Sequence, residues 1–192
     1  MKKLISKIMI VISFAVLVLC AQPIATQAKS NHIPNGFIID QRSDETTGNH
    51  FALTNLLGSY YNPMGQSFVP SKSKLVGIDF YIKKMMPLPL DQITDFTVTV
   101  REGSAEGRIL GVSKVQVPAT FLKGWQHVSF LPPVKLVPGR QYVFLVDCNR
   151  NAWHIVSHGD LSNNYPRGGW ILWGQPQGSN DLAFRTYTLK SK

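Results

Sequence analysis

The side chains with the best chemistry for binding a ligand lie between Gly139 and Trp173. This stretch holds three of the four tryptophans, Trp153, Trp170 and Trp173, and Tyr165 lies among them. An aromatic ring has a flat apolar face and, in tryptophan and tyrosine, a polar group, which suits stacking against a sugar ring. The four rings are therefore candidates for a ligand platform, although tryptophans in strands more often pack in a core.

Polar residues in the loops beside these rings can bind hydroxyl groups. Amide, carboxylate and guanidinium side chains supply the donors and acceptors that such binding needs. The candidates of this kind are Asn149, Arg150, Asp160, Asn163 and Arg167. Together with the rings they predict a site for a carbohydrate or another cell-surface ligand.

Residue types for nucleophilic catalysis are also present, but their placement argues against catalysis. Cys148, His154 and Asp160 supply a nucleophile, a base and an acid. Cys148 falls on the apolar side of a predicted strand, where a desolvated thiol stays protonated. No Gly-x-Ser-x-Gly sequence occurs, and glutamate occurs only at positions 45, 102 and 106. We therefore predict no catalytic residue and keep an extracellular hydrolase as an alternative.

Candidate metal ligands are scattered. His154 and His158 are four residues apart, which on a strand separates them by about 13 Å. One zinc ion lies about 2.0–2.1 Å from each ligand nitrogen and cannot reach both. Carboxylates in loops suit calcium, which takes oxygen ligands. The candidates for calcium, which we keep as an alternative to no cofactor, are Asp40, Asp44, Glu45, Asp147 and Asp181.

The first 28 residues predict a secretory signal peptide. Three lysines precede the apolar residues 8–20, and the small Ala28 closes the segment. The apolar run is shorter than the roughly 20 residues that span a bilayer, so we favour cleavage after Ala28 over a retained anchor. A lipidated Cys20 is disfavoured by Leu19 before it. The protein is expected outside the cell or in the cell envelope, with membrane contact only through an uncleaved leader.

Charge and cysteine content narrow the class further. Loss of residues 1–28 removes three lysines and leaves 17 basic against 11 acidic side chains, a net charge of +6. The basic residues form no run of the kind that binds nucleic acid, so we predict no nucleic-acid partner. Only Cys148 remains, so no intrachain disulfide is possible and a core must hold the fold.

Period-two alternation marks strands through most of the remaining chain. In residues 74–84 the apolar face is Val76, Ile78, Phe80 and Ile82, and the other face is Gly77, Asp79, Tyr81 and Lys83. Residues 141–148 are apolar on both faces, which is typical of a central strand covered on both sides. Short strands broken by Gly and Pro predict an all-β sandwich or barrel, and we favour a two-sheet antiparallel β-sandwich of jelly-roll type.

Five segments occur in an order that resembles non-catalytic β-sandwich modules of secreted microbial proteins. They are Gly65–Phe68, Leu75–Ile82, Val137–Val146, Tyr165–Trp170 and Asp181–Tyr187. This order is similar to that of carbohydrate-binding and galactose-binding-like jelly rolls. The resemblance implies turn and core roles for Phe68, Gly139, Tyr142, Gly168 and Phe184.

The sequence thus predicts three parts: a signal peptide over 1–28, a segment over 29–64 partly packed on the sandwich, and a β-sandwich domain over 65–192. The predicted function is a secreted, non-enzymatic module that binds a carbohydrate or a cell-surface polymer. A structural or adhesive envelope protein that acts through protein contacts is the main alternative.

Overall fold

The computed structural model describes residues 36–44, 46, 50–52, 63–150, 152–156, 165–177 and 180–190. The predicted signal peptide lies outside these residues, as do His158, Asp160 and Asn163. In the part of the chain that is described, no helix is long and apolar enough to cross a membrane.

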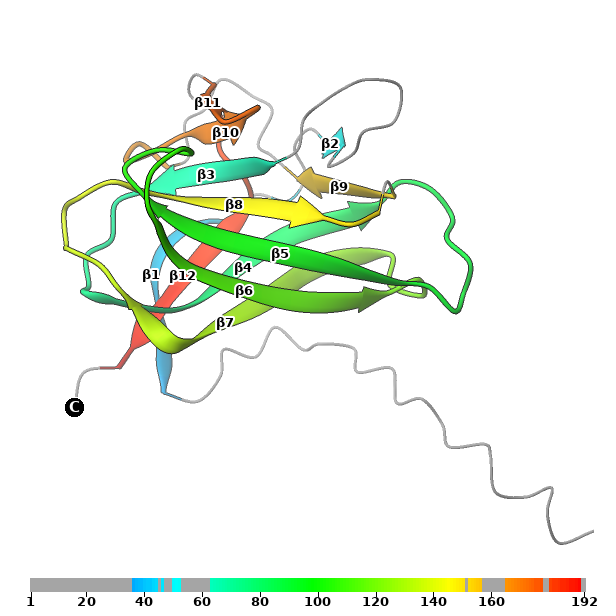
Figure 1. The fold of residues 1–192 in the computed structure, drawn as a ribbon, viewed down its shortest axis with the longest axis horizontal. Coiled ribbons are helices and arrows are strands. Elements are labelled where there is room, and N and C mark those ends of the chain that lie inside the picture. The colour runs from blue at the N-terminus through cyan, green and yellow to red at the C-terminus, as the bar shows by residue number, and fades with distance from the viewer. Residues whose placement is uncertain are drawn as a thin grey trace, which may run out of the picture. The chain divides into compact units, whose positions relative to one another are not determined.

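Within the described residues, twelve strands form two antiparallel sheets of six strands each (Figure 1). In the first sheet the order is β1-β12-β4-β9-β2, and β7 pairs with β4. In the second sheet the order is β11-β10-β3-β8-β5-β6. The predicted all-β class with two antiparallel sheets is confirmed.

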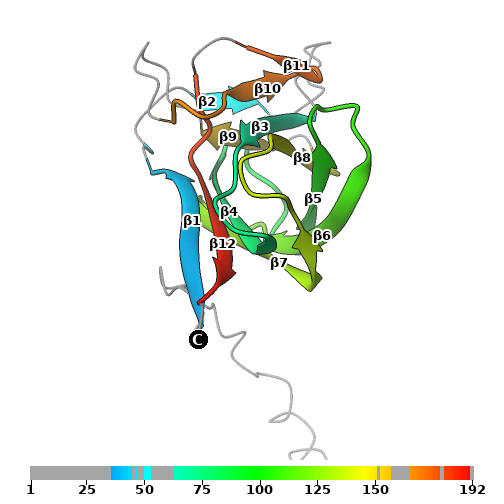
Figure 2. The same cartoon turned by 90° about the vertical axis from the view of Figure 1, so that its left-hand side faces the viewer.

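The strands of the first sheet are β1 (Phe37–Ser43), β2 (His50–Ala52), β4 (Lys74–Lys84), β7 (Lys123–Lys135), β9 (Trp153–Val156) and β12 (Phe184–Leu189). Those of the second sheet are β3 (Met64–Phe68), β5 (Ile93–Glu102), β6 (Ile109–Pro118), β8 (Tyr142–Cys148), β10 (Trp170–Leu172) and β11 (Gln175–Pro176). Figure 2 shows β12 and β4 on one side of the interior and β5 and β8 on the other.

Aromatic side chains from both sheets meet in the interior. The ring of Phe80 on β4 lies 5.8 Å from that of Phe96 on β5, and the ring of Phe144 on β8 lies 5.6 Å from that of Phe184 on β12. All four side chains are fully buried. Because burial of apolar surface is the main stabilising contribution to folding, these contacts hold the two sheets together.

The predicted alternation of β4 holds except at its start. Ile78, Phe80 and Ile82 face the core as expected. The pairing of β4 with β7 shifts register between Leu75 and Gly77. A bulge changes which side chains point inward, so Leu75 packs in the main core while Val76, although buried, lies outside that cluster.

Strand β8 is covered on both faces, as its sequence predicts. It lies between β3 and β5 in the second sheet. Its outward-facing Val143 and Leu145 form a small apolar cluster with Ile171 of β10 and Ala105 of the turn after β5. The outer face of the second sheet is therefore apolar at this point.

A buried polar network joins β3 to the chain before β12. The Gln66 amide donates to Asp181 Oδ1 over 2.7 Å, and Leu182 N–H donates to Gln66 Oε1 over 2.8 Å. The Tyr165 N–H donates to Asp181 Oδ2 over 2.8 Å, and its hydroxyl donates to Gln41 over 2.9 Å. Because buried polar groups are costly unless they are bonded, this network has one preferred arrangement.

Candidate functional site

Three of the four predicted aromatic residues are buried. Trp153 is 0% exposed, and Tyr165 and Trp170 are each 5% exposed. The indole N–H of Trp153 donates to Thr94 Oγ1 over 2.8 Å inside the protein. These three rings belong to the interior and present no face to a ligand in this structure.

Trp173 differs from the other predicted rings because it is 51% exposed. It lies in the turn between β10 and β11 and has a φ of 50°, in the left-handed region. This conformation is uncommon for residues other than glycine, and such residues cluster at binding and catalytic sites. Of the four predicted rings, Trp173 alone is placed to stack against a ligand.

Two of the predicted polar residues hold the end of β8 against the start of β5. The Asn149 amide donates to Asp95 Oδ2 over 3.0 Å. The Arg150 Nε donates to the carbonyl oxygen of Ile93 over 2.9 Å. Both side chains thus have structural bonds, and neither lines the groove described next.

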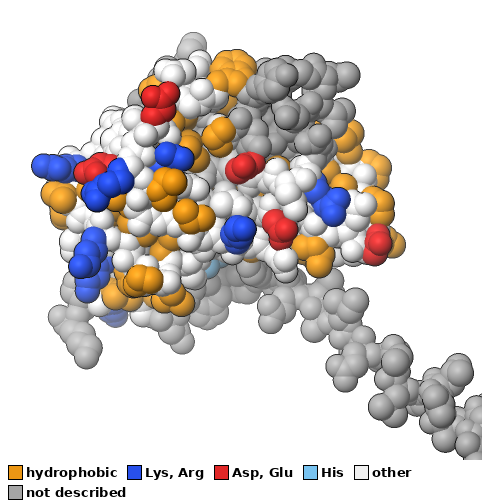
Figure 3. Space-filling model, in the orientation of Figure 1, with side chains coloured by type: hydrophobic (Ala, Val, Ile, Leu, Met, Phe, Trp, Pro, Cys, Tyr) orange, Lys and Arg blue, Asp and Glu red, His pale blue; other side chains and the backbone are white. Residues whose placement is uncertain are grey.

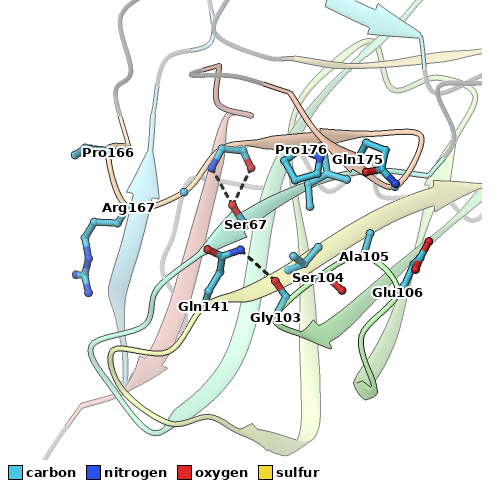
Figure 4. A pocket seen from close by; sticks show the side chains of 15 residues that line it. Ser67, Gly103, Ser104, Ala105, Glu106, Gln141, Pro166, Arg167, Gln175 and Pro176 are labelled. Atoms are coloured by element: carbon cyan, nitrogen blue, oxygen red, sulfur yellow. Dashed lines mark hydrogen bonds between the residues drawn. The ribbon is translucent and has the colours of Figure 1, made fainter.

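A groove of about 770 Å³ lies on the outer face of the second sheet. Val143 and Ile171 contribute apolar surface to it. Residues 103–106 line one side, and the segment 166–169 and strand β11 line the other (Figure 4). Its polar lining side chains are Ser67, Ser104, Glu106, Gln141, Arg167 and Gln175. Arg167 is therefore the predicted polar residue that the structure brings to this site, while Asp160 and Asn163 lie outside the described residues.

Hydrogen bonds fix both sides of the groove. Ser67 Oγ accepts from Gly169 N–H over 2.9 Å, and Ser67 N–H donates to the Gly169 carbonyl over 2.8 Å. A Cβ at Gly168 would lie 2.0 Å from the Ser67 carbonyl oxygen, so glycine is needed for this close approach. On the other side, the Gln141 amide donates to the Gly103 carbonyl over 3.1 Å. The groove is thus largely preformed.

The charged groups of the groove lie at its rim. Glu106 and Arg167 are both exposed, and Figure 4 shows them at opposite ends of the groove. More widely, basic and acidic side chains are interspersed among apolar ones on the face that carries β5 and β6 (Figure 3). The lining of the groove is more polar than apolar, unlike the mostly apolar lining of a typical small-molecule pocket.

A second polar cluster, which the sequence analysis missed, lies on the outer face of the first sheet. We call it the outer-face cluster. Its members on β4, β7 and β12 are Asp79, Tyr81, Trp125, His127, Ser129, Arg185 and Tyr187. On each strand these residues are two apart, and Asp79 is directly opposite both His127 and Arg185. The period-two alternation that marks the inward positions of these strands also marks their outward positions. The side chains at those outward positions were therefore the signal in the sequence for this cluster.

Asp79 is the centre of the outer-face cluster. Its Oδ1 lies 2.7 Å from His127 Nδ1, and its Oδ2 accepts a 2.5 Å hydrogen bond from the Tyr187 hydroxyl. The other imidazole nitrogen, Nε2, lies 3.0 Å from Ser129 Oγ. Burial, together with the bond to Asp79, raises the pKa of Tyr187. The Tyr187 hydroxyl therefore stays a neutral donor near pH 7.

Trp125 extends the outer-face cluster along β7. The Arg185 guanidinium carbon lies 4.1 Å from the centre of the Trp125 ring, a cation–π contact. The Arg185 Nε lies 2.5 Å from Asp44 Oδ1. The Tyr81 ring meets Trp125 edge-on at 5.5 Å. The cluster thus has an aromatic part beside its polar part.

The thiol of Cys148 has the protonated state that the sequence predicts. Burial raises its pKa from an ordinary value of 9.0 to about 11. Its Sγ lies 3.2 Å from the carbonyl oxygen of Arg150, to which it can donate. A thiol in this state is a poor nucleophile at neutral pH.

The carboxylates proposed for calcium lie in different places. Asp40 accepts from the backbone and side chain of Ser71, Asp44 pairs with Arg185, and Asp181 is bonded to Gln66. Among the residues that the structure describes, no group of three or more His, Cys, Asp or Glu side chains is placed to hold a metal ion. Glu45 lies outside those residues.

The fold defines the class as an all-β protein with two antiparallel sheets packed as a sandwich. No protein-family model matches the chain, and a search of curated proteins found no relative. The resemblance to carbohydrate-binding modules therefore rests on the five sequence segments alone.

Proposed function

We propose that the protein is a secreted module that binds a saccharide of a cell-surface polymer in the groove over the second sheet, and that the groove itself acts by binding and not by catalysis. The observation that carries this proposal is a groove of about 770 Å³ whose lining combines apolar side chains with hydroxyl, amide and charged groups. Trp173, half exposed in the turn that leads into β11, lies next in sequence to the lining residue Gly174.

The chemistry of the groove suits a sugar ring. A sugar has C–H groups on its faces, which pack against apolar or aromatic surface, and hydroxyl groups at its edge. The exposed Ser104 and Gln175 offer donors and acceptors, and the Glu106 carboxylate is an acceptor that can take two hydroxyls. Recognition of this kind needs neither a metal nor a covalent step.

Preorganisation supports the same proposal. Binding is weakened when loops and side chains must be ordered at the moment of association. Here the bonds from Ser67 to Gly169 and from Gln141 to Gly103 hold the two sides of the groove before any ligand arrives.

The test is a glycan array probed with the secreted protein, followed by titration with the strongest saccharide. We expect Trp173→Ala and Gln175→Ala each to weaken binding about fivefold or more, because truncation of a side chain that carries binding energy costs roughly 1 kcal/mol or more. Leu122→Ala is the matched control, because Leu122 is 67% exposed and does not line the groove. Absence of any bound glycan, or unchanged affinity in Trp173→Ala, contradicts the proposal.

A second candidate function is a structural or adhesive envelope protein that acts through protein contacts. The burial of Trp153, Tyr165 and Trp170 favours it, because these rings serve the interior rather than a ligand. In-cell cross-linking followed by identification of partners tests this candidate. A specific protein partner whose binding survives Trp173→Ala, with no glycan bound on the array, supports it over the saccharide proposal.

A further inference from the structure

The outer-face cluster contains a chain of three side chains that saccharide binding in the groove does not use. Asp79 on β4 contacts His127 on β7, and His127 in turn contacts Ser129 on the same strand. We propose that Ser129 is a nucleophile activated by His127, and that this face of the first sheet hydrolyses carboxylic esters with small acyl groups. The proposal is independent of the groove, which lies on the other sheet.

The hydrogen bonds set the roles of the two imidazole nitrogens. The Asp79 carboxylate accepts from His127 Nδ1–H over 2.7 Å, which leaves the lone pair on Nε2. The Ser129 hydroxyl lies 3.0 Å from Nε2 and donates its proton toward that lone pair. Nucleophile, base and orienting carboxylate are thus connected in the order that activates a serine.

The acid and the base of this chain are largely buried, whereas the hydroxyl is exposed. The side chains of Asp79 and His127 are 11% and 22% exposed, so water competes little for the bond between them. Ser129 is exposed, so an ester carbonyl can reach its Oγ from solvent. A shielded acid and base beside an accessible hydroxyl is compatible with attack on a substrate that arrives from solvent.

Neighbouring residues hold the imidazole in place. A Cβ at Gly77, which is opposite Ser129 on β4, would lie 2.6 Å from His127 Cε1. Glycine therefore leaves the room in which the ring lies. The Tyr187 ring meets the imidazole edge-on at 5.6 Å, and its hydroxyl fixes the second oxygen of Asp79. Gly77 and Tyr187 are positioning residues on this interpretation.

The reaction is a two-step hydrolysis. Ser129 Oγ forms a bond to the ester carbonyl carbon while its proton passes to His127 Nε2, and Asp79 stabilises the resulting imidazolium. The ester C–O bond then breaks, and the alcohol leaves with that proton. Water attacks the acyl-serine, gives a proton to His127, and the carboxylic acid departs as Ser129 recovers its proton. Ester and water are consumed, and alcohol and acid are formed.

The surroundings indicate the class of ester. Ser129 is exposed on the strand surface, so a short acyl group can reach its Oγ without an enclosed pocket. Trp125 is two residues from His127 on the same face of β7, about 7 Å along the strand, and carries the Arg185 guanidinium against its ring. An aromatic and cationic surface at this distance suits a polyhydroxy alcohol, so short-chain acyl esters of a saccharide are the expected substrates.

A covalent probe and a model ester test the proposal in the full secreted protein. A fluorophosphonate probe is expected to label Ser129, with the site identified by mass spectrometry, and 4-nitrophenyl acetate is expected to be hydrolysed. Ser129→Ala should abolish both. His127→Gln should slow both about 100-fold or more, which is the usual contribution of a general base. Ser73→Ala, an exposed serine outside the cluster, should leave both unchanged.

The melting temperature distinguishes a loss of the reaction from a loss of folding. Ser129 is exposed, so Ser129→Ala is expected to keep the melting temperature of the parent protein, and a lost reaction is then a loss of chemistry. The proposal is overturned if the folded parent protein shows no adduct at Ser129, or if Ser129→Ala reacts as fast as the parent.

Discussion

The side-chain amide of Gln66 donates a 2.7 Å hydrogen bond to the carboxylate of Asp181, and both side chains are fully buried. The two residues are 115 positions apart in the chain. Gln66 lies on β3 of the second sheet, and Asp181 lies just before β12 of the first. The same carboxylate accepts the N–H of Tyr165, where the chain begins its path to the groove. One buried carboxylate therefore fixes both sheet packing and one side of the groove.

Replacement of this carboxylate should be strongly destabilising. In Asp181→Ala one N–H of the Gln66 amide and the Tyr165 N–H lose their carboxylate partner in the interior, while the amide keeps its bond to the Ser67 carbonyl. We therefore expect the free energy of unfolding to fall by about 3 kcal/mol. Urea unfolding monitored by circular dichroism measures it. Asp91→Ala is the control, because Asp91 is exposed, and it should change stability by less than about 0.5 kcal/mol. A loss below about 1 kcal/mol for Asp181→Ala contradicts this role.

A side chain at position 168 should open the groove. In Gly168→Ala the added Cβ would lie 2.0 Å from the Ser67 carbonyl oxygen, so segment 166–169 must move away from β3. We expect a loss of about 1–3 kcal/mol in stability, as for other overpacked sites, together with weaker saccharide binding. Unfolding curves and glycan titration check the two effects. Unchanged stability and affinity together show that the close approach is not required.

The tryptophans should differ in their access to solvent. In variants that keep one tryptophan each, acrylamide should quench Trp173 most efficiently, because it is 51% exposed, whereas Trp153 and Trp170 are 0% and 5% exposed. Fluorescence quenching in the folded protein gives the comparison, and the same variants in urea serve as fully accessible controls. Equal quenching of Trp173 and Trp153 in the folded protein argues against the proposed aromatic contact.

The Cys148 thiol should make stability fall as the pH rises from 9 to 11. In the unfolded chain the thiol ionises near its ordinary pKa of 9.0, whereas burial holds it protonated to about 11 in the folded protein. Below pH 9 both states are protonated and the group has no effect. Between the two values the unfolded state alone loses the proton, which removes about 2 kcal/mol of stability.

Cys148→Ser removes this titration and keeps a donor toward the Arg150 carbonyl. The pH dependence of urea unfolding in the parent protein should therefore be steeper between pH 9 and 11 than in the variant. A second check is alkylation by iodoacetamide at pH 8, which should be at least tenfold slower in the folded protein than in urea because the thiolate is scarcer. Parallel stability curves for the two proteins disprove the assignment.

Alternation in the sequence predicts which residues of a strand share a face, and this proved sufficient for β8 and for the part of β4 after its bulge. It does not predict what covers the outward face. Val143 and Leu145 have a cover only because Ala105 and Ile171 lie over them. For the same reason the sequence alone does not predict the exposure of Trp153, Trp170 and Trp173, because that exposure depends on contacts between distant segments.

The outer-face cluster depends on pairing as well as on alternation. Asp79 and His127 are 48 residues apart and meet because β4 and β7 pair in one register. A shift by one residue would send one of the two side chains into the core. The residue types were visible in the sequence, but the register is set by the bulge between Leu75 and Gly77 and by the core packing of both strands.

The two surfaces are built in different ways, and this limits how each can evolve. The groove is bordered by the turn at residues 103–106 and by Gly174 in the turn between β10 and β11, and turns accept insertions at little cost. A lineage can therefore enlarge or narrow the groove by changing turn length. The outer-face cluster sits within strands, where one inserted residue reverses the orientation of every side chain that follows. Its chemistry can be altered only by substitution, one position at a time.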